Sequence, residues 1–313
     1  MSATIQAPSL PIRSSAEPPA VIIAAAGVFA DRARRFHALA EGHVLADWLR
    51  FLGRLTQAQH QALQALPALP LPDALALERA RGHAMPPLPA QHWPRAPAWR
   101  VVLRDIVAAL HAADVPAAAR ESCDRLEAAT DAQLEACADR VLATELYGQD
   151  AALLPFVAAA LQVYWTALAM ALGSGGGIGI HAIDVPNVCP CCGSLPVASV
   201  VRMVPEFSNL RYLHCSLCNT EWNLVRIKCA ACDATGKIAY RHLEGSDLPN
   251  AEAMRVETCD DCMSYLKILY LEKAPAGDPV ADDLATLALD ILADEAGYSR
   301  AGPNLLFVPG ASQ

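Results

Sequence analysis

The chain has 313 residues, of which 54% are hydrophobic and 18% are charged, a composition that excludes intrinsically disordered and fibrous proteins. Its formal net charge of −9 argues against a protein that binds the phosphate backbone of nucleic acids. Residues 181–313 hold 10 basic and 17 acidic side chains, so most of the negative charge lies in this part of the chain.

Residues 1–172 are predicted to form a flexible N-terminus, residues 1–20, followed by a helical domain, residues 21–172. The first residues contain no basic segment followed by an apolar run, so we expect no export signal and a cytoplasmic location. From residue 21 onward, hydrophobic residues such as Phe29, Ala33 and Phe36 recur at helical spacing. The proline-rich stretch 67–97 is expected to be a loop over the surface.

An uncharged stretch, Ala151–Ile183, contains a part, Leu153–Leu172, that is long enough to cross a membrane. It is rich in alanine, it includes the polar residues Gln162 and Thr166, and its nearest flanking charges are aspartates. These features are untypical of membrane spans. We therefore expect a buried central helix without membrane insertion. The glycine-rich residues 173–182 are expected to form a linker.

Beyond this linker the pattern changes to short β-branched or aromatic runs, which are typical of strands. The expected strands are Val197–Met203, Arg211–His214, Trp222–Lys228, Lys237–Leu243, Ala253–Glu257 and Tyr265–Glu272. A helix is predicted in residues 276–313, capped by Asp278 and packed on a neighbouring domain. Asp282 and Asp283 are expected to be charges of its first turn.

Nine of the eleven cysteines lie between Cys189 and Cys262, and eight of them form four C-x-x-C pairs. Such a pair forms a tight turn, here called a knuckle, and two knuckles complete a tetrahedral four-sulfur shell around a metal ion. An internal repeat indicates the pairing, because each half reads knuckle, strand, strand, knuckle, strand. Site one is predicted to consist of Cys189, Cys192, Cys215 and Cys218. Site two is predicted to consist of Cys229, Cys232, Cys259 and Cys262. A cross-braced pairing of first with third and second with fourth knuckles remains an alternative.

Sulfur-only ligation suits zinc and iron, and the residue types alone do not choose between them. Cys191 lies inside the first knuckle and is expected to be a spectator thiol, while Cys123 and Cys137 are expected to be small buried hydrophobic residues. Three histidines flank the metal region and are expected to be structural or solvent-facing: His181, His214 and His242. No catalytic residue is predicted.

The sequence therefore predicts an α+β protein. An all-helical N-terminal domain precedes two tandem rubredoxin-like or zinc-ribbon β modules, residues 183–228 with site one and residues 229–275 with site two. Residues 276–313 are predicted to form a C-terminal helix and tail. The helices and the two modules are expected to form one rigid body.

Several segments carry a resemblance to a known family. Val188–Ser199, Leu210–Trp222, Glu257–Tyr270 and Ala281–Asp290 resemble the formate dehydrogenase accessory protein FdhE family, and Arg34–His43 and Ala46–Phe51 are more loosely similar to its first helices. The resemblance implies a cytoplasmic assembly factor, not an enzyme, that binds the catalytic subunit of respiratory formate dehydrogenase and is required for its maturation and activity. It also implies that the eight cysteines of sites one and two bind rubredoxin-type iron, with zinc as the alternative. Whether the chain forms a homodimer stays open.

Two other functions are consistent with cysteine knuckles. Tandem zinc ribbons often bind nucleic acids, but the β region has only ten scattered Lys and Arg side chains to neutralise phosphates. A rubredoxin-like electron carrier would need iron, which visible absorption and metal analysis distinguish from zinc.

Overall fold

The computed structural model describes residues 18–91, 94–174, 180, 183, 185–204, 207–242 and 252–308. Its helices are α1 (Val28–Leu39), α2 (Ala46–Ala65), α3 (Ala74–Gly82), α4 (Ala98–His111), α5 (Ala117–Ala128), α6 (Asp131–Leu142), η1 (Ala151–Leu153), α7 (Leu154–Ser174), α8 (Pro279–Leu284) and α9 (Leu287–Glu295). Its strands are β1 (Val21–Ile22), β2 (Pro196–Val204), β3 (Phe207–Cys215), β4 (Glu221–Asn223), β5 (Ile238–Arg241), β6 (Met254–Cys259), β7 (Ser264–Tyr270) and β8 (Ser299–Arg300). The α+β class predicted from the sequence is confirmed.

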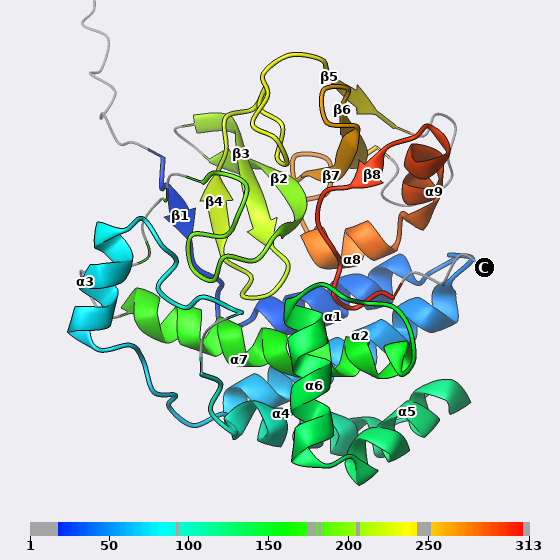
Figure 1. Cartoon of the computed structure of the whole chain (residues 1–313). Coiled ribbons are helices and arrows are strands. Elements are labelled where there is room, and N and C mark those ends of the chain that lie inside the picture. Colours follow the sequence, from blue (N-terminus) through cyan, green and yellow to red (C-terminus); the bar gives the residue numbers. More distant parts are fainter. Residues whose placement is uncertain are drawn as a thin grey trace, which may run out of the picture.

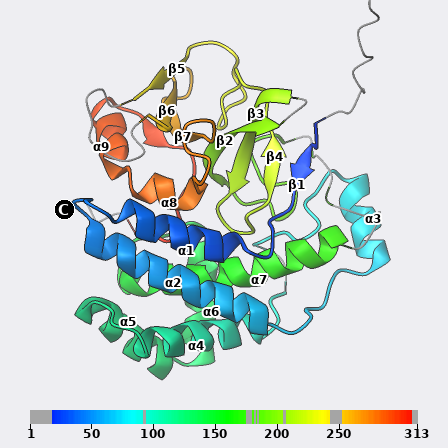
Figure 2. The same ribbon diagram turned by 180° about the vertical axis from the view of Figure 1, so that it is seen from behind.

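Helices α1, α2 and α4 to α7 lie in one half of the molecule, whereas the sheet lies in the other half together with α8 and α9 (Figure 1). In the views of Figures 1 and 2, α1 and α7 lie next to the sheet region, and α4 and α5 lie farthest from it. The predicted hydrophobic stripe of α1 faces inward, because Phe29, Ala33 and Phe36 are all buried. Burial of such stripes, rather than helix propensity, holds these helices together.

Two short elements differ from the expectation for residues 21–97. Val21–Ile22 form β1, which pairs with β4, so the helical region begins only at Val28. The proline-rich stretch contains α3, because residues 73–85 carry no proline and Asp73 caps the helix by accepting a hydrogen bond from the Ala76 amide at 2.8 Å.

The uncharged helix α7 is the centre of the helical half. By length and composition, residues Ala151–Ser174 could cross a membrane, but 83% of the most hydrophobic stretch is buried inside the protein. The helix contacts α2, α4 and α6, and both Gln162 and Thr166 are fully buried. This arrangement is typical of the core helix of a globular protein.

The strands form one sheet instead of two separate ones. Its order is β1-β4-β3-β2-β7-β6-β5, and β8 pairs with β7. The first repeat contributes the antiparallel strands β2, β3 and β4, and the second contributes β5, β6 and β7. Strands β2 and β7 join the repeats in parallel, with Ser199 opposite Ile268. The expected strand Trp222–Lys228 is only three residues long, Glu221–Asn223.

The predicted C-terminal helix is divided into α8 and α9. Asp278 caps α8 as expected, because its side chain accepts hydrogen bonds from the amides of Val280 and Ala281. Helix α8 packs on both α1 and β2. Asp282 and Asp283 do lie in this short helix, but both are completely buried ion-pair partners, a role that their position in the first turn did not reveal.

One hydrophobic core crosses the expected boundaries between the helical and the β regions. It contains residues of α1, α2, α4 and α7 together with Cys189 and Cys215 of site one and Leu284 of α8. A second, smaller cluster lies between β6, β7 and α9, around Met254 and Leu289. The limits predicted between the helical domain, the two β modules and the C-terminal segment therefore stay predictions. The main hydrophobic core is continuous across them.

Some sequence predictions fall outside the described residues: most of the flexible N-terminus, most of the linker 173–182, His181, and the end of the expected strand Lys237–Leu243. Gly173 and Ser174 of the expected linker are the last two residues of α7.

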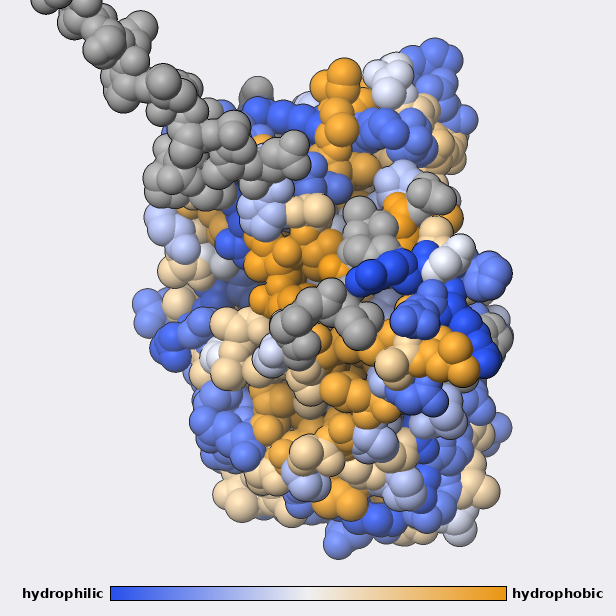
Figure 3. Space-filling view, turned by 90° about the vertical axis from the view of Figure 1, so that its left-hand side faces the viewer, coloured by the Kyte–Doolittle hydropathy of each residue, from blue (hydrophilic) through white to orange (hydrophobic). Residues whose placement is uncertain are grey.

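Hydrophobic side chains gather on the face of the molecule that carries α3 and β1 (Figure 3). Leu75 of α3 and Val185 are each at least half exposed. A hollow of about 490 Å³ lies beside β1 and β4, lined by Val185, Pro190 and Trp222 among others. Pro190 belongs to the first knuckle, so an apolar surface adjoins site one.

Candidate metal centres

The four knuckles share one backbone feature. The residue directly after the second cysteine of each pair has a positive φ, namely Gly193 (+76°), Asn219 (+57°), Asp233 (+64°) and Met263 (+52°). This left-handed conformation turns the chain back so that both sulfurs of a pair face the same point. Glycine, asparagine and aspartate are the residues that adopt this conformation most easily. In three of the four knuckles, the residue type after the second cysteine therefore also indicated the turn. The C-x-x-C spacing alone does not contain this information.

The first knuckles of the two repeats also share their hydrogen bonds. The Cys189 amide donates to the Ser194 carbonyl at 2.9 Å, and the Cys229 amide donates to the Ala234 carbonyl at 2.8 Å. A reverse bond closes each turn, from Gly193 to Cys189 and from Asp233 to Cys229. The internal repeat in the sequence therefore corresponds to a repeat in backbone geometry.

Met263 is the exception among these residues, because a long side chain is strained at positive φ. Met263→Gly is expected to raise the free energy of unfolding by about 1 kcal/mol, since the side chain is 44% exposed and little packing is lost. Urea unfolding measures the change. The matched variant Gly193→Ala, at the equivalent place in the first knuckle, is expected to lower stability by about 1–2 kcal/mol. If Met263→Gly lowered the free energy of unfolding instead, it would refute the claim that Met263 is strained.

Site one brings together the four sulfurs that the repeat assigned to it. Its sulfurs lie within 4.8 Å of one another, with Cys189 3.5 Å from Cys218 and Cys192 3.5 Å from Cys215. All four residues are buried. The amides of Leu217 and Cys218 donate to the sulfur of Cys215 at 3.4 Å, which is the arrangement that stabilises a thiolate.

The polar residues of α7 hold the second knuckle of site one. The Gln162 side chain donates to the Ser216 carbonyl at 2.8 Å, and the Asn219 amide group donates to the Thr166 hydroxyl at 2.8 Å. Gln162 and Thr166, whose polarity is untypical of a membrane span, are thus the residues through which α7 contacts site one.

The proline-rich stretch holds the first knuckle. The Leu88 amide donates to the Cys191 carbonyl at 3.0 Å, and the Ala90 amide donates to the Cys192 carbonyl at 2.9 Å. The Trp165 indole of α7 in turn donates to the Leu88 carbonyl at 3.2 Å. The segment expected to be a surface loop therefore covers site one.

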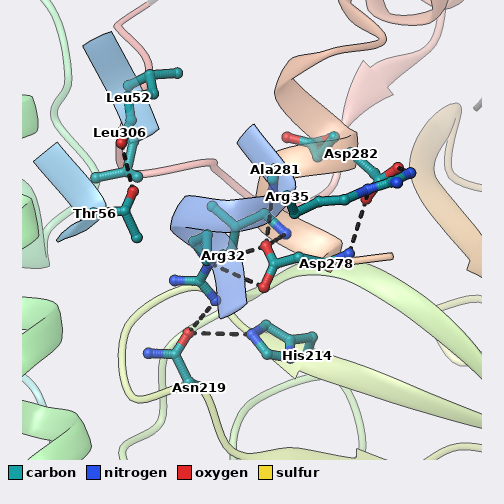
Figure 4. A network of polar contacts seen from close by, with 12 residues as sticks. Arg32, Arg35, Leu52, Thr56, His214, Asn219, Asp278, Ala281, Asp282 and Leu306 are labelled. Carbon is teal, nitrogen blue, oxygen red and sulfur yellow. Dashed lines mark hydrogen bonds and ion pairs between the residues drawn. The ribbon is translucent and has the colours of Figure 1, made fainter. Parts of the chain in front are cut away.

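A buried polar network connects site one with α1 and α8 (Figure 4). Arg32 of α1 is completely buried and donates to both oxygens of Asp278, at 2.9 and 3.1 Å. It also donates to the Asn219 side chain at 2.8 Å, and His214 contacts the same Asn219 oxygen at 3.2 Å. His214 is therefore buried and structural, as one of the two expectations for it stated, and Asn219 is one of its partners.

Glu221 closes this network. Burial alone would raise the pKa of its carboxyl, but hydrogen bonds and charges from His214 and Arg202 lower the pKa to about 2. Since this pKa is depressed on folding, its stabilisation is present above pH 4.5 and lost as the pH falls toward 2.

Replacement of Glu221 tests this pH dependence. Wild-type protein is expected to lose up to about 3 kcal/mol of stability between pH 4.5 and 2 through this group. Glu221→Gln should flatten that part of the curve, whereas Glu272→Gln, at an exposed site, should leave it unchanged. Urea unfolding at several pH values checks both; parallel curves for wild type and Glu221→Gln would contradict the assignment.

Site two has the same plan but a different exposure. Cys229 lies 3.7 Å from Cys262, and Cys232 lies 3.8 Å from Cys259. Cys229 and Cys259 are buried, whereas Cys232 and Cys262 are exposed. The sulfur of Cys262 lies 2.9 Å from the Ser264 hydroxyl. The pairing agrees with the sequential assignment and not with the cross-braced alternative.

The geometry of both clusters fits a tetrahedral metal ion. Four sulfurs placed about 2.3 Å from a common centre lie about 3.8 Å apart, and the measured pairs are 3.5–3.8 Å apart. A disulfide would need about 2.0 Å, and all eleven cysteines, each within the described part of the chain, are free. Either cluster could hold a metal ion.

A buried ion pair links the two repeats. Arg211 of β3 donates to Glu257 of β6 at 2.8 Å, to Ser199 of β2, and to the carbonyl of Lys228, the residue before Cys229, at 2.7 Å. Burial raises the pKa of Glu257 although Arg211 opposes this shift. Sequence reasoning missed this contact, because it depends on the parallel pairing of β2 with β7.

The burial of the remaining candidates is as follows. Cys191 and Cys123 are buried, and burial raises the pKa of the Cys123 thiol to about 11. Cys137 is half-buried. His242 is exposed.

Comparison with known proteins covers the whole region of these sites. Family models described as "FdhE, N-terminal", "FdhE, central domain" and "FdhE, C-terminal domain" match residues 17–176, 188–226 and 227–307. "Protein FdhE homolog" of Stutzerimonas stutzeri is 39% identical over 312 residues, 99% of each chain. "Protein FdhE" of Escherichia coli O1:K1 / APEC is 35% identical over 296 residues, 95% of this chain and 93% of the relative.

A solved structure is also similar. The crystal structure of the FdhE protein from Pseudomonas aeruginosa superposes with a TM-score of 0.82 at 39% identity, covering 94% of this chain and 100% of that chain.

Proposed function

The chain belongs to the FdhE family, and from this membership we propose that it is an accessory protein for formate dehydrogenase maturation. In this proposal it binds the catalytic subunit in the cytoplasm and is required for that subunit to become active, without itself being an enzyme or a component of the mature complex. The family models that match almost the whole chain support this role.

The eight knuckle cysteines are proposed to hold two metal ions. The observation that carries this step is the proximity of the sulfurs: all four in each cluster lie within 4.8 Å of one another, and two pairs in each cluster are 3.5–3.8 Å apart. A four-sulfur shell around zinc is closed and structural, whereas iron in the same shell can also change its charge by one electron. Iron is favoured by the family resemblance, and zinc is the alternative.

The chain's own residues prepare these shells. Backbone amides donate to Cys215 and Cys229, which offsets the negative charge that four thiolates bring together. Around site one, Gln162 and Thr166 fix the knuckle from outside. These contacts hold the knuckles in the folded protein, so metal binding and folding stabilise each other.

Loss of the protein in its own host tests the role in maturation. Formate dehydrogenase activity is expected to disappear and to return with the wild-type chain, while the amount of catalytic subunit stays measurable by immunoblot. Capture of the catalytic subunit on the tagged chain tests the direct contact. Full enzyme activity without the protein would contradict the proposal.

Acidic side chains of the C-terminal half are proposed to contribute to recognition of the catalytic subunit, because residues 181–313 carry 17 acidic against 10 basic groups. Reversal of three exposed charges, Glu272→Lys, Asp294→Lys and Glu295→Lys, is expected to weaken capture about tenfold at low salt. The measurement is a titrated pull-down at two salt concentrations.

The control reverses three exposed carboxylates of the helical half, Glu78→Lys, Asp105→Lys and Glu121→Lys. Because both variants change the net charge equally, a general effect of charge would weaken both. Equal capture by the two variants would reject the acidic surface as part of the contact.

A further inference from the structure

The two cysteine clusters have the same ligands but different access to solvent. We propose that site one is a closed structural centre and that site two is the exchangeable one, where a thiol or another metal-binding group from solution can reach the ion. This inference rests on the proposed function, in which both clusters hold a metal ion.

Other parts of the chain cover the cysteines of site one. Its cysteines are at most 1% exposed. Helix α7 covers the second knuckle through Gln162 and Thr166, and Leu88 and Ala90 cover the first. An incoming ligand can reach these sulfurs only if the segment around Leu88 and α7 separates from the knuckles.

Opening of that kind is costly, because site one belongs to the main hydrophobic core of the protein. The same core holds Trp165 of α7 and Leu284 of α8, so exposing the knuckle removes packing from both. Local opening that breaks core contacts has a free energy close to that of global unfolding. Release from site one is therefore expected at the slow rate of such opening.

Among the described residues, site two has less cover. Cys232 and Cys262 are exposed, one in each knuckle, and Met263 beside them is 44% exposed. In the described part of the chain, the sulfurs of Cys229 and Cys262 contact the Ala231 amide and the Ser264 hydroxyl, both from the same repeat. Figure 1 shows β5 and β6 on the side of the sheet away from α4 and α5.

The exposed positions matter because they lie on opposite edges of the shell. Cys232 is 3.8 Å from Cys259, and Cys262 is 3.7 Å from Cys229. A donor from solution can therefore approach next to either exposed sulfur and displace it, while the other three cysteines, two of them buried, keep hold of the ion. The exchange changes no oxidation state: one metal–sulfur bond breaks, one bond to the incoming donor forms, and the freed thiolate takes a proton from water.

The test uses the full chain reconstituted with two zinc ions and an excess of the chromogenic chelator 4-(2-pyridylazo)resorcinol. Absorbance follows the released zinc, and native mass spectrometry counts the ions that remain. One ion per chain is expected to leave at least about tenfold faster than the other, because only the slower one requires local opening. Two ions that leave at one common rate would overturn the inference.

Peptide mapping identifies the fast site in the unmodified protein. A pulse of iodoacetamide during the fast phase is expected to label cysteines of site two, Cys232 and Cys262 first, and to leave those of site one unlabelled. Labelling of Cys189 or Cys215 in that phase would overturn the inference even if two rates are seen.

A variant gives an independent reading. Cys262→Ser is expected to bind one zinc ion per chain and to lose the fast phase entirely, with the slow phase unchanged. A wild-type chain that takes up fewer than two ions would instead overturn the proposed metal sites themselves, and with them this inference. Failure of the inference and failure of the proposed function are therefore distinguishable.

Discussion

Cys215→Ser is expected to prevent the chain from folding into a stable, soluble protein. Structural metal binding contributes roughly 10 kcal/mol or more to the folded state, which is comparable to the whole stability of a typical domain. Because Cys215 is buried in the main core and its shell is clamped by α7, losing the ion also removes the support of the surrounding packing. The soluble fraction after expression and urea unfolding of that fraction measure the effect.

The repeat supplies a matched control at the equivalent position, Cys259→Ser. It is expected to lower stability less, because the cysteines of site two are not part of the main core and half of them are exposed. Cys137→Ser, at a half-buried cysteine outside the knuckles, should change stability by about 0.5 kcal/mol or less. A Cys215→Ser protein as soluble and stable as Cys137→Ser would contradict a structural role for site one.

Arg32→Met is expected to lower the free energy of unfolding by about 3–5 kcal/mol. Removal of one partner of a buried ion pair leaves the other charge without compensation, and here Asp278 would lose two hydrogen bonds from the Arg32 guanidinium. Asn219 would lose its contact as well, so the effect extends to the knuckle of site one. Urea or thermal unfolding of the purified proteins gives the difference.

Arg34→Met on the same helix is the matched control. Arg34 pairs with Asp31, but both side chains are more than half exposed, so this substitution should cost less than about 1 kcal/mol. The double variant Arg32→Met/Asp278→Asn should recover part of the loss, because no uncompensated buried charge remains. Equal effects of Arg32→Met and Arg34→Met would show that the network does not hold α1 to α8.

The cysteine pairing could be predicted from the sequence because it is a local property. The two-residue spacers and the internal repeat allow few pairings of the four knuckles. The sulfurs of Cys189 and Cys218 lie close together, as the repeat predicts. The buried central helix was predictable for a similar reason, since its alanines, Gln162 and Thr166 are poor candidates for contact with lipid.

The joining of the repeats into one sheet could not be predicted in the same way. It depends on the parallel contact of β2 with β7, between residues such as Ser199 and Ile268 that are far apart in the sequence. The Arg211–Glu257 pair follows from that contact. Pairing of distant strands leaves no periodic signal in either segment, so pattern analysis recognises the strands but not their neighbours.

The unequal burial of the two sites escaped prediction for a related reason. Both knuckle pairs look alike in sequence, and what covers site one comes from α7 and from the stretch around Leu88, which precede it by many residues. The prolines of residues 67–97 indicated a loop, but they did not indicate that this loop packs on the first knuckle of site one. Asp282 shows the same limit, because its partner Arg35 lies 247 residues away in the chain.

Metal content is the most direct test of the view that two cysteine clusters each hold one ion. Elemental analysis of the full chain, purified without oxygen, is expected to give two iron or zinc ions per chain, in accord with its two clusters, with visible absorption distinguishing ferric iron from zinc. Intact mass should show eleven free thiols once the metal is removed. Protein that carries no metal, or that contains disulfides between the knuckle cysteines, would contradict the account.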